Sequence, residues 1–331
     1  MEDEKIYAIG IDLGATKIRF AVVSFDGKIC LELNVQTNVK GGYQAVLDQV
    51  ILGIKELKNK WDQSLVGIGI GVAGQVDSLS GNVIFGPNLN WHHVPLKADL
   101  EQSLGLPVFV LNDVQAITWG EWFFGAGKGC DNFVCVFIGT GIGGGIINDG
   151  KFYSGCSGSA GEIGHIVIDF NGVDCTCGGK GCFEAYAGGW GIARMAREFF
   201  LKEKVIYKDS QILQSAQKNI QNITSKNVCE AYLKGDVLAK KIIEEFQRAM
   251  IAGCCSLVNV LNPCRLIIGG KILDAIPEVM GNICMGLKKY ALSAPMQHLE
   301  ILGSILKNDA GVIGVVAFIC SKYSKKDSIG N

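Results

Sequence analysis

The pattern that most restricts the fold of this chain is a strand–glycine turn–strand sequence that occurs twice. Residues 7–25 read YAIGIDLGATKIRFAVVSF, and residues 133–153 read FVCVFIGTGIGGGIINDGKFY. In each, apolar and β-branched runs flank glycines, which favour tight turns between strands. Because such a repetition is typical of duplicated units, it predicts two related lobes.

The rest of the chain alternates between helical and strand spacing, which predicts a mixed α/β fold. Val46, Val50, Ile54 and Leu57 form one apolar stripe of a predicted helix over residues 42–59. Further on, the spacing predicts helices near 184–201, 209–219, 224–234 and 236–261. We expect an N-terminal lobe at residues 1–117, completed by a last helix at about 310–325, and a larger lobe at 118–309.

Composition narrows the class of protein. The 331 residues carry a net charge of -1, which gives no indication of a nucleic-acid or membrane partner held by charge. No apolar run approaches the roughly 20 residues that a membrane helix needs, and the acidic N-terminus lacks the apolar segment of a signal peptide. These features predict a cytoplasmic protein with reduced cysteines, although there are 13 of them.

The two glycine turns are candidate phosphate-binding loops, since glycine lets backbone N–H groups approach an anion closely. Together they are able to hold one polyphosphate, with Asp12 binding Mg²⁺; the alternative is two tight hairpins without a ligand. The first glycine loop, residues 12–17, offers Asp12, Gly14, Thr16 and Lys17. The second glycine loop, residues 139–143, offers Gly139, Thr140, Gly141 and Gly143.

The second glycine loop also fits the dinucleotide-binding pattern G-x-G-x-x-G, through Gly139, Gly141 and Gly144. That pattern must open a helix, whereas the next residues, GIINDGKF, favour a strand and a turn. We therefore do not assign dinucleotide binding to this loop.

A carboxylate ends the predicted strand VFVLND, where Asn112 and Asp113 stand at the start of a helix. In one interpretation Asp113 is an N-cap, which contributes about 1 kcal/mol to helix stability. In the other it lies at the carboxyl end of a strand, where α/β proteins bind ligands, and accepts a hydroxyl proton. The residues alone favour the cap.

A second group of polar residues surrounds the glycine-rich stretch CTCGGKGCFE at 175–184. One histidine and three thiolates match a closed tetrahedral zinc site, formed by His165, Cys175, Cys177 and Cys182. The alternatives are a C-x-C redox pair and three unrelated thiols. Nearby, Glu162 and Glu184 are either sugar ligands, since carboxylates accept hydrogen bonds from hydroxyl groups, or solvated surface residues.

Taken together, these motifs resemble the ROK family (repressors, open reading frames and kinases) of the actin/hexokinase-like superfamily. The resemblance covers nearly the whole chain, and its most specific part is E-x-x-H followed by C-x-C-x₄-C-x-E. It departs from the usual pattern at Ala15, Ala73, Val114 and Gln115, none of which removes a catalytic group. The resemblance implies two ribonuclease-H-like lobes with a cleft between them.

The resemblance also implies the roles of individual residues. Asp113 is similar to the catalytic base of sugar kinases, and the two glycine loops are similar to their ATP phosphate loops. Gly269 and Gly270 match the glycines on the adenosine side. The zinc ligands would be structural. The implied sugar-binding residues are Gly74, Asn88, Asn112, Glu162, His165 and Glu184.

We therefore expect an ATP-dependent hexose kinase that uses Mg²⁺, contains structural Zn²⁺, acts on the sugar 6-hydroxyl, and forms a dimer or tetramer. Glucose is the first choice of sugar, and N-acetylmannosamine or another N-acetylhexosamine is the alternative. A sugar-sensing repressor is a second class, but the first strand begins by about Ile6 and leaves no room for a helix-turn-helix. A zinc module that only binds is a third.

Overall fold

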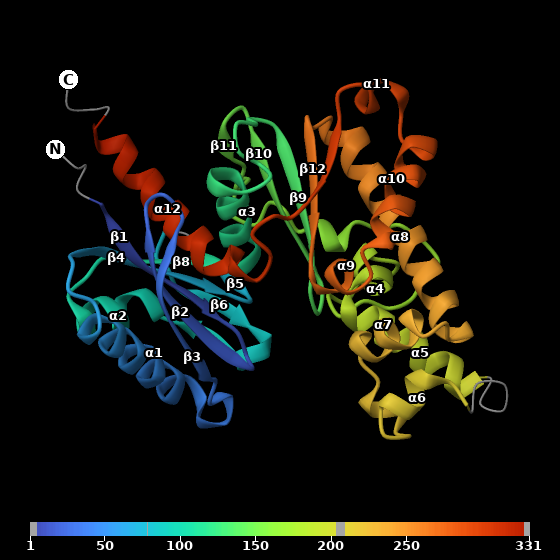
Figure 1. The fold of residues 1–331 in the computed structure, drawn as a ribbon, viewed down its shortest axis with the longest axis horizontal. Coiled ribbons are helices and arrows are strands. Elements are labelled where there is room, and N and C mark those ends of the chain that lie inside the picture. Colours follow the sequence, from blue (N-terminus) through green and yellow to red (C-terminus); the bar gives the residue numbers. More distant parts are fainter. Residues whose placement is uncertain (1–4, 78, 203–208, 328–331) are drawn as a thin grey trace. The chain divides into compact units, whose positions relative to one another are not determined.

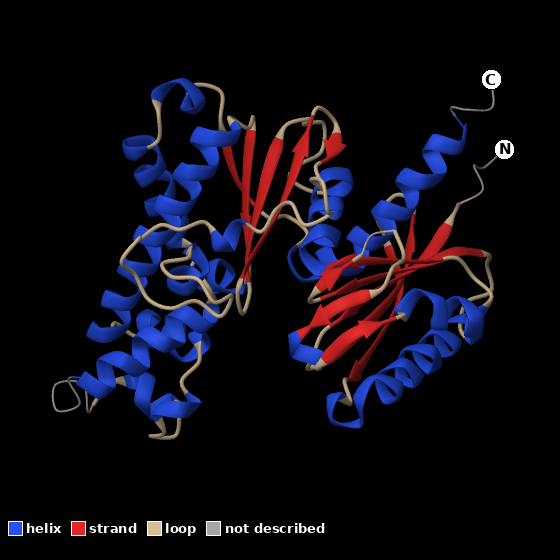
Figure 2. Ribbon diagram, turned by 180° about the vertical axis from the view of Figure 1, so that it is seen from behind, coloured by secondary structure: helices blue, strands red, loops and turns tan. Residues whose placement is uncertain are grey.

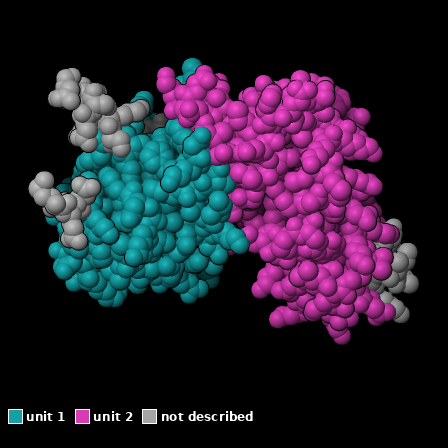
Figure 3. Space-filling model, turned by 45° about the horizontal axis from the view of Figure 1, so that its top comes forward, with its two compact units in different colours: residues 1–129, 154–159, 305–331 teal, residues 130–153, 160–304 magenta. Residues whose placement is uncertain are grey.

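A computed structural model describes residues 5–77, 79–202 and 209–327. The chain forms two compact units (Figure 3). Unit 1 comprises residues 1–129, 154–159 and 305–331, and unit 2 comprises residues 130–153 and 160–304. The division after residue 129 differs from the one that we expected after residue 117, because the intervening helix packs within unit 1.

Unit 1 contains a five-stranded sheet in the order β3-β2-β1-β4-β8 (Figures 1 and 2). The two pairs β1–β2 and β2–β3 are antiparallel, whereas β1–β4 and β4–β8 are parallel. A smaller sheet has the order β5-β6-β7. The elements are β1 (Tyr7–Leu13), β2 (Lys17–Ser24), β3 (Ile29–Gln36), α1 (Gly42–Asn59), β4 (Leu65–Val72), β5 (Gln75–Val76), β6 (Val83–Gly86), β7 (Trp91–Val94), α2 (Leu96–Leu104), β8 (Val108–Asn112), α3 (Asp113–Phe124) and α12 (Ala310–Asp327).

The two faces of this sheet are buried by different helices. On one face the alternate residues Ile9 and Ile11 of β1 pack with the apolar stripe of α1, as its spacing predicted. On the other face lies α12, which approaches the strands so closely that a side chain at Gly10 would overlap the Val312 carbonyl. A Cβ at Gly69 would lie 2.7 Å from Val315 Cβ. Glycines in β1 and β4 therefore seat α12 directly on the backbone of the sheet.

The beginning of α12 is tied to the sheet by Arg19 of β2, which is only 7% exposed. Its guanidinium donates two hydrogen bonds to the Glu32 carboxylate, at 2.8 and 3.1 Å. It also donates to the Asn308 carbonyl at 2.6 Å and to Asp309 Oδ1 at 2.5 Å. Arg19 thus joins β2, β3 and the segment that leads into α12.

Unit 2 contains a second five-stranded sheet, in the order β11-β10-β9-β12-β13. The segment predicted as one helix over 184–201 is divided at Gly188, and the helix predicted over 209–219 spans only 211–215. The elements are β9 (Phe133–Ile138), β10 (Ile142–Asn148), β11 (Lys151–Phe152), α4 (Phe183–Ala187), α5 (Gly189–Lys202), α6 (Gln211–Ser215), α7 (Ser225–Leu233), α8 (Val237–Leu261), β12 (Arg265–Gly269), α9 (Lys271–Ala275), α10 (Glu278–Tyr290), α11 (Ser293–Met296) and β13 (Glu300–Gly303).

The core of unit 2 lies between this sheet and the helices α4, α5 and α8. Phe183 of α4, Phe200 of α5 and Phe246 of α8 are fully buried in one cluster with Val134 and Val136 of β9. Because β10 begins at Ile142, the second glycine loop joins two antiparallel strands. It opens no helix, which confirms that the G-x-G-x-x-G pattern is not a dinucleotide-binding turn.

Candidate active site

The predicted acids of unit 1 lie at one edge of its sheet. The strands β1, β4 and β8 are parallel neighbours, and residues at their carboxyl ends align in register, with Asp12 opposite Gly71 and Val72 opposite Asn112. Asp12 therefore lies at the same edge as Gly74, which comes after β4, and Asp113, which comes after β8. This is the edge at which ligands bind in α/β sheets with parallel strands.

The N-cap of α3 is Asn112, so the interpretation of Asp113 as the cap is wrong. Asn112 Oδ1 accepts hydrogen bonds from Val114 N at 2.9 Å and Gln115 N at 3.2 Å. Its Nδ2 donates to the Gly74 carbonyl at 2.9 Å. The amide of Asn112 thus joins two of the predicted sugar-binding positions and caps the helix, so Asp113 is not needed as a cap.

Asp113 is the first residue of α3, and its environment favours the neutral carboxylic acid. Burial, followed by the negative charge of Asp12, raises the pKa of Asp113 to about 6. Hydrogen bonding acts in the opposite direction, since Asp113 Oδ1 accepts from Val114 N at 2.9 Å. A carboxyl group with this pKa is suited to accept a proton near neutral pH, as a general base does.

The first glycine loop is closed by backbone hydrogen bonds and held by Thr37 at the end of β3. Gly14 N donates to the Lys17 carbonyl at 3.1 Å. Thr37 N donates to the Thr16 carbonyl at 3.1 Å, and Thr37 Oγ1 donates to the Gly14 carbonyl at 2.7 Å. Thr16 and Lys17 are exposed at the turn, where they are accessible to a ligand.

The remaining predicted sugar residue of unit 1, Asn88, is exposed in the short 3₁₀ helix Pro87–Leu89.

In unit 2 the second glycine loop lies beside Gly269 and Gly270. The strands β9 and β12 are parallel neighbours, with Gly269 opposite Phe137. A side chain at Gly270 would overlap the Ile138 carbonyl, so this position requires a glycine. The residues of unit 2 that the sequence predicts to bind ATP therefore lie at one edge of the second sheet.

Glu184, predicted as a sugar ligand, contacts the second glycine loop. Its Oε2 accepts a hydrogen bond from Ile142 N at 2.8 Å, and its Oε1 accepts one from Trp190 Nε1 at 3.0 Å. The sequence analysis did not select Trp190; a tryptophan six residues after a candidate acid is too weak a signal. The sequence analysis did not select Arg19 either, because its carbonyl partner Asn308 lies 289 residues away in the chain.

His165 and the three cysteines of the stretch CTCGGKGCFE form one cluster. Their candidate ligand atoms all lie within 4.8 Å of one another. His165 Nδ1 is 3.8 Å from Cys175 Sγ, and Cys177 Sγ is 3.7 Å from Cys182 Sγ. Ligands at roughly 2.3 Å from a tetrahedral ion are about 3.8 Å apart, so these four residues fit such an ion.

The other ring nitrogen of His165 faces Glu162, with His165 Nε2 and Glu162 Oε2 4.0 Å apart. Glu162 is exposed, and His165 is half-buried. Orientation of a metal-binding imidazole by its second nitrogen is common in metal sites. The arrangement places one more predicted sugar-binding acid next to the cysteine cluster.

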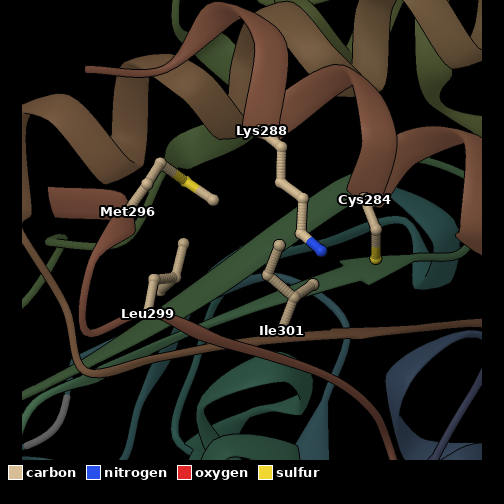
Figure 4. Close-up of a pocket in the computed structure, with 5 residues that line it drawn as sticks. All are labelled: Cys284, Lys288, Met296, Leu299 and Ile301. Carbon is tan, nitrogen blue, oxygen red and sulfur yellow. The ribbon is translucent and has the colours of Figure 1, made fainter. Parts of the chain in front are cut away.

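Unit 2 also contains a cavity of about 430 Å³, away from these residues. It is lined by Cys284, Lys288, Met296, Leu299 and Ile301, which belong to α10, α11, β13 and the segment between them (Figure 4). None of the predicted site residues lines this cavity, so we do not include it in the candidate site.

Comparison with known proteins places the chain in a family. Residues 8–322 match the ROK family. Glucokinase of Thermotoga maritima is 34% identical over 95% of this chain and 98% of its own length. The solved structure of a ROK family glucokinase from Streptomyces griseus in complex with glucose and AMPPNP is 33% identical, covers 96% of this chain and 99% of that one, and has a TM-score of 0.82. A xylose repressor of Caldicellulosiruptor bescii is 31% identical over 95% of this chain and 78% of its own length.

The chain belongs to the ROK family, which confirms the resemblance seen in its motifs. The likeness to the solved ROK kinases also confirms the predicted fold class, an α/β fold of the actin/hexokinase-like type.

Proposed function

We propose that this ROK-family protein is an ATP-dependent kinase that transfers a phosphoryl group to the 6-hydroxyl of glucose. The observation that carries the proposal is Asp113, a carboxyl group at the carboxyl end of β8 with a pKa of about 6. The similarity to glucokinases supports glucose as the sugar. A xylose repressor is also similar, so catalysis itself must be tested.

In the proposed mechanism, Asp113 accepts the proton of the sugar 6-hydroxyl as that oxygen attacks the γ-phosphorus. The bond between the γ-phosphorus and the bridging oxygen of ADP breaks, and ADP leaves. Phosphoryl transfer depends mainly on positioning and on neutralising charge. The N–H groups of the two glycine loops would bind the phosphates, and Glu162 and His165 would bind sugar hydroxyl groups. Mg²⁺ bound with ATP would neutralise phosphate charge. Asp12 is the residue that would hold this ion, since it is a carboxylate at the same end of the parallel strands as Asp113.

We further propose that the four-residue cluster holds structural Zn²⁺. All four protein ligands of a tetrahedral ion are present, so the site offers no open position for catalysis. The ion would fix the segment from His165 to Cys182. Cys177→Ser is expected to lose zinc, measured by metal analysis, and to weaken sugar binding, measured by calorimetry. Zinc loss with unchanged sugar affinity would contradict a role of the cluster in sugar binding.

The direct test of the proposed function is ADP release from ATP across a panel of sugars. We expect release that depends on glucose, with lower kcat/KM for mannose, N-acetylmannosamine and xylose. Phosphorylation of the 6-hydroxyl is checked by NMR of the product. If no sugar stimulates ADP release while a sugar still binds, the protein is a sugar sensor and the kinase proposal is wrong.

Two further expectations stay predictions from the sequence, namely a cytoplasmic location and assembly into a dimer or tetramer. Within residues 5–77, 79–202 and 209–327, no helix is long and apolar enough to span a membrane.

A further inference from the structure

The second glycine loop is held by residues that come after the cysteine cluster in the chain. Besides the two hydrogen bonds of the Glu184 carboxylate, the first two residues of α5 contact the loop. Gly189 N donates to the Gly139 carbonyl at 3.1 Å, and Trp190 N donates to the Thr140 carbonyl at 2.9 Å. Four hydrogen bonds therefore tie Glu184, the loop and the start of α5 together.

These bonds fix the direction of two peptide planes in the loop. In a planar trans peptide the carbonyl and the following N–H point in opposite directions. Because the Gly139 and Thr140 carbonyls point toward α5, the N–H groups of Thr140 and Gly141 point away from it. Within the described part of the chain, neither N–H has a hydrogen-bond acceptor. Two adjacent free N–H groups with a common direction form a site for an anion such as a phosphate.

Gly141 is what allows Glu184 to reach the loop. A Cβ at Gly141 would overlap the Glu184 carboxylate. The backbone of Gly141 has no positive φ, so this glycine is not required by a turn. It is required by the approach of Glu184.

The path from the cysteine cluster to this contact is short. Cys182 is the N-cap residue of α4, and Glu184 is the second residue of that helix. The helix is anchored by Phe183, whose side chain is fully buried and whose N–H donates to the Ile166 carbonyl at 2.8 Å. Cys182 and Glu184 are therefore joined through the anchored first turn of α4.

We infer that Glu184 and Trp190 are positioning residues for the nucleotide, because they orient the N–H groups of the second glycine loop toward its phosphates. The inference rests on the proposed function. The zinc-binding segment thereby controls nucleotide affinity as well as sugar affinity. Sequence reasoning had assigned Glu184 to the sugar alone.

The test is Trp190→Phe, which removes the indole donor and keeps most of the packing. We expect the dissociation constant for MgADP, measured by calorimetry without sugar, to rise about 3- to 10-fold, since hydrogen bonds to charged groups are among the stronger ones. Glucose affinity without nucleotide is expected to change less than twofold, and zinc content not at all. The matched control is Trp91→Phe, because Trp91 Nε1 is buried without a hydrogen-bond partner.

A second measurement keeps the inference testable if Trp190→Phe fails to fold. Gly141→Ala pushes the Glu184 carboxylate aside, whereas in a Glu184→Ala background the new methyl group has no carboxylate to overlap. We expect each single change to weaken MgADP binding and the double change to be no worse than Glu184→Ala alone. Additive effects would show that the two residues act independently, and would overturn the inference.

The contribution of the cysteine cluster is tested with Cys182→Ser, which is expected to weaken MgADP binding together with glucose binding. If Trp190→Phe leaves MgADP affinity unchanged in an enzyme with glucose-dependent ADP release, the inference is wrong and the proposed function stands. If the unmodified protein binds no nucleotide, both are wrong.

Discussion

The two five-stranded sheets have the same order and the same strand directions, yet their glycine loops are held in different ways. In each sheet two antiparallel pairs adjoin two parallel pairs. The first glycine loop is held by neutral hydrogen bonds from Thr37, a residue at the end of an adjacent strand. The second is held by the charged Glu184, which comes from beyond the cysteine cluster.

The two sheets also differ in the residues at the carboxyl end of their fifth strand. The strand β8 leads into Asn112 and Asp113, whereas β13 ends at Gly303 and leads into Ser304 and Ile305. A duplicated topology thus provides two candidate phosphate loops but only one acid in the position of a base. In the proposed function the chemical step therefore belongs to unit 1, and substitutions in each unit test this difference.

The largest effect is expected for Asp113→Asn. Loss of the general base should lower kcat about 10³-fold, within the range typical of such groups. Glucose and MgADP dissociation constants are expected to change little, as measured by calorimetry. The matched control is Asp99→Asn, another acid of unit 1, which accepts a hydrogen bond from Tyr43 Oη at 2.8 Å. A rate within tenfold of the unmodified enzyme would remove Asp113 from this role.

The second comparison is between two ion pairs that join neighbouring strands. Arg19→Gln breaks the contacts of the buried Arg19 side chain with Glu32 and Asp309, and is expected to lower the free energy of unfolding by about 2 kcal/mol. Arg265→Gln breaks the more exposed pair with Glu300 in the other sheet, where about 1 kcal/mol or less is expected. Urea unfolding measures both. Equal losses would contradict the importance of the Arg19 contacts for seating α12.

The pH dependence of kcat/KM tests the environment of Asp113. The carboxylate is the active form, so activity should rise with pH through about 6 and fall roughly tenfold per pH unit below it. Because the negative charge of Asp12 helps to raise this pKa, Asp12→Asn should move the midpoint to lower pH. An unchanged midpoint in Asp12→Asn would show that the two acids do not interact.

Ionisation of Asp113 is expected to raise activity but to lower the stability of the fold. The folded protein binds this proton more tightly than the unfolded chain, so the group loses stability as pH rises from about 4 to about 6. Asp113→Asn removes that loss and should melt at the same temperature as the unmodified protein, or higher, at pH 7. A lower melting temperature would indicate that Asp113 has a structural role.

The smallest effect is expected for Thr37→Val, which removes one neutral hydrogen bond from the first glycine loop. We expect stability to fall by about 1 kcal/mol and MgADP affinity to change less than threefold. A change larger than that of Trp190→Phe would reverse the proposed difference between the two loops. Calorimetry and urea unfolding of both variants decide this.

The sequence was sufficient for the family, the fold class and the residues of the cysteine cluster, because ordered motifs and ligand spacing are local properties. It was insufficient where the outcome depended on side-chain direction. Asn112 and Asp113 are consecutive, and only the helix geometry decides which of them is the cap. The contact of Glu184 with Ile142 N joins residues 42 positions apart, and no spacing rule indicates it.

The packing of α12 on Gly10 and Gly69 has a consequence for the order in which the two units fold during synthesis. During synthesis, β1 and β4 leave the ribosome long before α12, while one face of their sheet depends on that helix. Unit 2 is made in between and contains its own core, so it is able to fold first. Until residue 310 and its successors emerge, α12 does not cover this face of the first sheet, to which Ala8 and Ala21 also belong.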